Sequence, residues 1–139
     1  MSTKNNPFSK KVFTTVVAIF CIVTLSAFYY QQPPWKAPAS ADAKKNPLTA
    51  YAGTIAAGKE VYTKECQSCH GKGGKGDGPS AVQLDVQAGN FTTTVTQGQS
   101  DGALYWKISE GRKPMPSLKK KLNETQIWQS VVYMRTFKK

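Results

Sequence analysis

The stretch Cys66-Gln67-Ser68-Cys69-His70 decides how this sequence is interpreted. It places two thiols three positions apart and an imidazole directly after the second thiol. Near the end of a helix, this spacing turns both sulfurs toward one side of the chain. The five residues hold the single histidine and two of the three cysteines of the chain. The cysteine and histidine chemistry of the protein is therefore concentrated in one turn.

Three other kinds of site use paired cysteines. A thioredoxin-type redox pair requires a surrounding βαβ pattern, and none is present. A structural zinc site needs four ligands, but Cys21 lies in an apolar block and there is no second histidine. A disulfide remains open for an exported pair, but it leaves His70 unexplained. The motif therefore predicts one covalent haem c, held by thioethers to Cys66 and Cys69, with His70 as an axial ligand of the iron.

The second axial ligand must be another kind of residue, because the chain contains one histidine. The soft candidates are Met1, Met115 and Met134. Met1 precedes the apolar block, and Met134 belongs to an apolar helical stripe that is typical of core packing. Met115 lies between Pro114 and Pro116, in a loop that cannot be helical and that restricts the side chain. We predict Met115 as the second axial ligand.

Residues 12–30 carry no charged side chain and are mostly apolar. A helix of this length spans about 28 Å, close to the hydrocarbon thickness of a bilayer. The tail 1–11 is basic, which favours a cytoplasmic location for it. We expect a retained single-pass anchor in the lipid bilayer. A cleaved signal peptide is the alternative, with Ala39-Ser40-Ala41 as a distant small-residue site.

The 139 residues allow one compact domain and an appendage. Residues 31–50 contain four prolines among Ala, Ser and Lys, and are expected to form an extended linker with a reach of roughly 60 Å. Residues 51–139 are then the folded domain.

Gly58-Lys59-Glu60-Val61-Tyr62 and the motif after it resemble the first helix and haem motif of class I cytochromes c. The resemblance continues to the C-terminus with Gly76-Asp77-Gly78-Pro79, the Lys113–Pro116 loop and Trp128-x-x-x-Val132-Tyr133-Met134-Arg135. It implies the all-α cytochrome c fold, a small helical bundle around one haem with His and Met ligands, preceded here by one transmembrane helix. It also implies that the backbone carbonyl of Pro79 accepts a hydrogen bond from His70.

Helical spacing predicts the elements around the haem. A helix over about 55–66 brings Gly58 to a face where close contact with another helix is expected. A second helix is expected over 101–110. Asn123 and Gln126 predict a capping box at the start of a C-terminal helix.

An iron with both axial positions filled has no open site for a substrate, so we expect a carrier and not an enzyme. The predicted task is one-electron transfer in a bacterial respiratory or similar chain, on the periplasmic face of the inner membrane. One alternative is a fixed haem subunit of a quinol-oxidising complex or terminal oxidase. A haem peroxidase is a more distant alternative, because Met115 would have to leave the iron.

The net charge of +11 indicates an anionic partner. Lysines flank the two ligand loops, where a cationic rim could steer docking to membrane redox complexes or acidic redox proteins; no nucleic acid is expected. A merely solvated surface and contact with anionic headgroups are the alternatives. The rim consists of Lys72, Lys75, Lys113, Lys119, Lys120 and Lys121.

Overall fold

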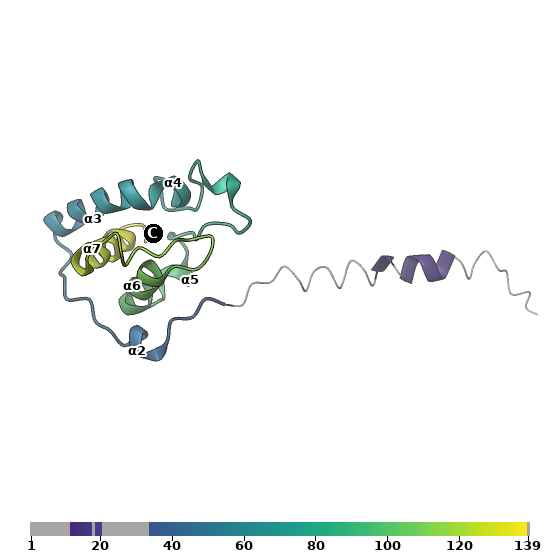
Figure 1. Cartoon of the computed structure of the whole chain (residues 1–139), viewed down its shortest axis with the longest axis horizontal. Coiled ribbons are helices and arrows are strands. Elements are labelled where there is room, and N and C mark those ends of the chain that lie inside the picture. The colour runs from purple at the N-terminus through teal and green to yellow at the C-terminus, as the bar shows by residue number, and fades with distance from the viewer. Residues whose placement is uncertain (1–11, 18, 21–33, 139) are drawn as a thin grey trace, which may run out of the picture. The chain divides into compact units, whose positions relative to one another are not determined.

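The computed structural model describes residues 12–17, 19–20 and 34–138 (Figure 1). The chain divides into two compact units, Met1–Trp35 and Lys36–Lys139.

The N-terminal unit contains the predicted tail 1–11 and anchor 12–30. The tail and most of the anchor lie outside the described residues; the described parts, 12–17 and 19–20, are helical. Within the described part of the chain, no helix combines the length and the apolar character needed to cross a membrane.

The second unit is helical, as expected, and the described residues contain no strand beyond one isolated bridge between Arg112 and Met115. Helices α3, α6 and α7 are the long elements, and α7 packs against both of the others (Figure 1). In chain order the elements are α2 (Ala39–Asp42), α3 (Ala52–Glu65), α4 (Gln67–His70), the 3-10 helix η1 (Ala81–Gln83), α5 (Thr94–Gln97), α6 (Asp101–Glu110) and α7 (Glu124–Arg135).

The crossing of α3 and α7 forms the centre of the domain. A Cβ atom added to Gly58 would lie 2.1 Å from the carbonyl oxygen of Gln129 and 2.9 Å from Cβ of Tyr133. Only glycine allows the two backbones to approach this closely. The close contact predicted at Gly58 is therefore confirmed, and its partner is the C-terminal helix.

The start of α7 carries the predicted capping box. The side chain of Asn123 accepts a hydrogen bond from the backbone of Gln126 at 2.9 Å, and the side chain of Gln126 accepts one from the backbone of Asn123 at 3.0 Å. Two of the backbone N–H groups at the helix start are thereby satisfied. The predicted helix over 101–110 is also confirmed, as α6.

Residues 36–50, which we call the strap, differ from the extended linker expected from the sequence. They belong to the second compact unit and contain α2, which packs against α6. A Cβ atom added to Gly102 of α6 would lie 2.1 Å from the carbonyl oxygen of Ala41 and 2.6 Å from that of Lys44. The prolines predicted an extended chain, but a glycine far along the sequence provides the surface on which the strap lies.

Polar contacts complete the attachment of the strap. The hydroxyl of Ser100 donates to Asp42 at 2.6 Å, and the amide of Asn46 donates to Asp101 at 3.2 Å. The ammonium of Lys44 forms an ion pair with Glu124 at 2.7 Å and lies 4.4 Å from the ring centroid of Tyr105. These partners all belong to the starts of α6 and α7 or to the face between them.

Candidate haem-binding site

The two cysteines lie at the junction of α3 and α4. Cys66 ends α3, and its carbonyl accepts the backbone N–H of His70 at 2.9 Å, so one turn of chain holds the whole motif. Both thiols are free and half-buried. Burial, reinforced by the Glu65 carboxylate and then by Cys69, raises the pKa of the Cys66 thiol to about 12.

The imidazole of His70 has a defined orientation. Its Nδ1 lies 3.0 Å from the carbonyl oxygen of Gly89. Because a carbonyl can only accept, Nδ1 carries the proton and Nε2 is left with the lone pair that an iron ligand needs. Burial lowers the pKa of His70, although the bond to Gly89 acts in the opposite direction. The ring is thus neutral and presents Nε2.

Gly89 takes the role that the sequence analysis assigned to Pro79. Pro79 is exposed and lies in a turn that braces α4, where Gly78 N–H donates to Cys69 O at 3.1 Å. The chain then continues through η1 before Gly89 reaches the imidazole. The assignment to Pro79 is therefore corrected, because every residue carries a carbonyl and only the path of the loop decides which one faces His70.

Phe91 was also missed by the sequence analysis. Its ring stacks on His70, with 4.4 Å between ring centroids and an interplanar angle of 23°. Its backbone N–H donates to Gly74 O at 2.6 Å, which ties the segment that carries Gly89 to the glycine-rich loop. The signal in the sequence that could have identified Phe91 is that it is a lone aromatic residue in a polar loop. Phe91 fixes the imidazole plane, while Gly89 fixes its rotation.

Tyr62 connects the site to the core. Its side chain is 1% exposed, and its hydroxyl donates to Gly71 O at 2.6 Å. The ring contacts those of Phe91 and Tyr133, at centroid distances of 6.2 and 5.2 Å. The loop after His70 is thus fastened to α3, one turn before Cys66.

The predicted ligand loop is closed by its own backbone. Arg112 N–H donates to Met115 O at 3.0 Å, and Met115 N–H donates to Arg112 O at 2.9 Å. Met115 is half-buried and packs against the hydrophobic core, whereas Met134 is 5% exposed within that core. The structure therefore gives the two methionines different surroundings, a braced loop and a packed helix.

A family model described as "Cytochrome C oxidase, cbb3-type, subunit III" matches residues 53–134 of the chain. The chain belongs to this family. The match includes the haem motif, the Met115 loop and almost all of α3 and α7.

Two solved structures resemble this member of the cbb3-type subunit III family. A chain of the Kuenenia stuttgartiensis reducing HAO-like protein complex Kustc0457/Kustc0458 is 31% identical, with a TM-score of 0.62 over 81% of this chain and 54% of that one. The KustC0563 c-type cytochrome is 28% identical, with a TM-score of 0.52 over 59% of this chain and 98% of that one. No match was found among curated proteins.

The family and the neighbouring structures establish the cofactor and the general task. This member of the cbb3-type subunit III family is a class I c-type cytochrome that binds haem c covalently. A cytochrome c domain of this family supports haem-based electron transfer. The local chemistry fits the cofactor, because two free thiols lie within one turn of a neutral imidazole whose Nε2 is available. When bound, the haem supplies the one-electron couple of the iron.

Proposed function

We propose that this chain is a one-electron carrier of a bacterial respiratory or similar chain, with His70 and Met115 as the axial ligands of a haem attached to Cys66 and Cys69. Its domain acts at the periplasmic face of the inner membrane, held there by residues 12–30. The observation that carries the ligand assignment is the bridge between Arg112 and Met115, which presents a half-buried thioether from a closed loop. A thioether ligand raises the reduction potential of the iron.

The ligand assignment is tested by the far-red charge-transfer band of ferric haem bound to methionine sulfur. We expect the band in the wild-type protein and its loss in Met115→Ala. Met134→Leu is the matched control, because it removes a sulfur from the packed core with little change in volume. A band that persists in Met115→Ala, or disappears in Met134→Leu without unfolding, would assign the ligand differently.

The domain docks on an acidic partner through part of the predicted lysine rim. Lys119 forms an ion pair with Glu110 at 2.7 Å, and Lys121 forms one with Glu65 at 2.5 Å. These two charges are partly neutralised within the domain. The exposed rim residues left to support docking are Lys72, Lys75, Lys113 and Lys120.

Charge reversal separates docking from a merely solvated surface. We expect Lys120→Glu to slow electron transfer to the native membrane partner by about tenfold at low salt, and the difference to shrink as salt screens it. Lys45→Glu makes the same charge change on the strap and should have less effect. Equal, salt-independent rates for the two variants would remove the docking proposal.

The strap favours a second candidate function, that of a fixed haem subunit in a larger membrane complex. Because residues 36–50 pack on the domain, only residues 31–35 would separate the proposed anchor from the folded unit. Five extended residues span about 17 Å, compared with roughly 60 Å for the linker expected from the sequence. A short reach suits a partner at the membrane surface. The family description and the neighbour from a redox complex also support this candidate.

Purification in mild detergent distinguishes the two functions. A fixed subunit co-purifies with an oxidase or quinol-oxidising complex in stoichiometric amount and resists removal by salt. A carrier elutes alone and exchanges electrons with added, separately purified complex.

A further inference from the structure

A buried carboxylate lies at the haem-bearing end of α3. The side chain of Glu65, the residue before Cys66, is 5% exposed, although it belongs to a charged residue type. Its partner is the ammonium of Lys121 at 2.5 Å, whose side chain is 61% exposed. Burying a carboxylate costs free energy unless a partner compensates it. This pair therefore differs from an ordinary surface ion pair.

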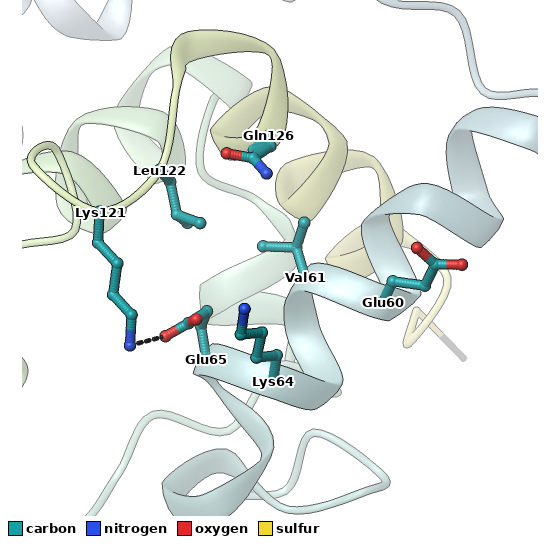
Figure 2. A pocket seen from close by; sticks show the side chains of 7 residues that line it. All are labelled: Glu60, Val61, Lys64, Glu65, Lys121, Leu122 and Gln126. Carbon is teal, nitrogen blue, oxygen red and sulfur yellow. Dashed lines mark ion pairs between the residues drawn. The ribbon is translucent and has the colours of Figure 1, made fainter.

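The pair crosses a gap between α3 and the chain that precedes α7. Figure 2 shows side chains from α3 on one side of a pocket and side chains from the later segment on the other, with the ion pair between them. The pocket has a volume of about 280 Å³. Apolar contact between the two sides is thus incomplete, and the ion pair is a direct link across it. The lining residues are Glu60, Val61, Lys64, Glu65, Lys121, Leu122 and Gln126.

The segment 117–122 is already fastened on its other side. Leu118 N–H donates to Ile108 O at 3.2 Å, and the Ser117 hydroxyl donates to Ser109 O at 2.7 Å, so the segment lies along the end of α6. It directly follows the loop that carries Met115. The Glu65–Lys121 pair attaches the same segment to α3.

We propose that the Glu65–Lys121 pair is a latch that holds segment 117–122, and with it the Met115 loop, against the haem-bearing end of α3. Glu65 and Lys121 are then positioning residues that act through the segment. The latch links the residue next to the thioether of Cys66 to the chain next to the second axial ligand. This inference rests on the proposed ligation by Met115, and deepens it.

The unequal exposure of the two partners predicts unequal effects. Loss of the Lys121 ammonium leaves the Glu65 carboxylate buried and unpaired, so the segment must open to hydrate it. Loss of the Glu65 charge lets Lys121 turn fully into water, which costs less. Lys121→Met should therefore disturb the segment more than Glu65→Gln. An ordinary exposed ion pair would give small and similar effects.

Amide hydrogen exchange on the haem-loaded protein tests the latch without any activity measurement. We expect the Leu118 and Met115 amides to exchange about tenfold faster in Lys121→Met, and by a smaller factor in Glu65→Gln. In the double variant, which carries both Glu65→Gln and Lys121→Met, no buried charge is left unpaired, so the exchange rates of these amides should return toward the wild-type values. The far-red band should be lost at a lower temperature in Lys121→Met.

Lys64→Met is the matched control, because it removes the same charge from the same pocket without removing the partner of Glu65. Equal exchange rates in Lys64→Met and Lys121→Met would overturn the latch. Faster exchange of Leu118 with an unchanged Met115 amide would also overturn it, because the effect would end before the ligand loop. Absence of the band in the wild-type protein would instead reject ligation by Met115, while exchange would still decide the latch.

Discussion

The α3–α7 crossing and the strap are both contacts between distant parts of the sequence, but they are built differently. At the crossing, Gly58 lets two helix backbones touch, and the surrounding aromatic side chains are largely buried. The strap is held largely by polar contacts to the starts of α6 and α7, and Lys44 and Glu124 are both open to water. At Gly102 the strap approaches α6 as closely as α7 approaches α3 at Gly58.

The difference indicates a division of tasks. The crossing holds Tyr62, which fastens the loop after His70, so its rigidity passes directly to the imidazole. The strap touches the starts of α6 and α7, away from that loop. We expect changes at the crossing to alter stability and haem attachment, and changes at the strap to alter mainly the strap itself.

The largest effect is expected from Gly58→Ala. The new methyl group would overlap the Gln129 carbonyl, and neither backbone can move without separating the helices. We expect a loss of at least about 3 kcal/mol in the free energy of unfolding, measured by urea denaturation of the haem-loaded protein. Gly73→Ala is the control, because its Cβ would meet nothing closer than 4.0 Å. Similar losses in both variants would contradict the special role of the crossing.

Tyr62→Phe should have the next largest effect. It removes the hydroxyl and keeps the ring, so the buried carbonyl of Gly71 loses this donor. We expect a loss of about 1–3 kcal/mol. Tyr51→Phe, at an exposed tyrosine, should leave stability unchanged. If both variants unfold at the wild-type urea concentration, the hydrogen bond to Gly71 does not stabilise the domain.

The same tyrosine predicts a pH dependence. Burial is the main cause that raises the pKa of Tyr62 far above its usual value of 10.0. The unfolded chain therefore releases this proton first, and stability falls as the pH rises above about 10. Comparison of urea unfolding at pH 8 and pH 11 should show a steeper fall for the wild-type protein than for Tyr62→Phe. Parallel curves would contradict this contribution from Tyr62.

Gly102→Ala should release the strap and leave the rest of the domain folded. Its methyl group would overlap the Ala41 carbonyl, but the strap lies at the periphery and can move away. We expect faster proteolysis within residues 36–50 and a smaller loss of stability than in Gly58→Ala. A loss as large as that of Gly58→Ala would mean that the strap is part of the folding core.

Lys44→Met should have the smallest effect. It removes the ion pair with Glu124 and the contact with the Tyr105 ring, but both charges are exposed and screened by water. We expect a modest increase in proteolysis of the strap. Lys45→Met, the neighbouring change, should not alter the cleavage rate; equal cleavage in the two variants would show that Lys44 does not hold the strap.

The sequence by itself determined the features whose chemistry is local. Cys66, Cys69 and His70 are adjacent in the chain, so their spacing alone indicated covalent haem, which the family membership confirms. The helices around the site followed from residue spacing, and Asn123 with Gln126 predicted a cap that requires only one turn of chain. The glycine at position 58 was recognisable because glycine is unfavourable within a helix unless another element needs the space.

Only the tertiary structure decided which distant groups meet. The carbonyl that faces His70 belongs to Gly89 and not to Pro79, because the path of an irregular loop determines it. The strap packs on α6 although its prolines favour extension, because Gly102 offers a surface that no local pattern in the strap reveals. Side-chain chemistry within one turn can be read from the order of residues, whereas contacts across the fold depend on where each backbone finally lies.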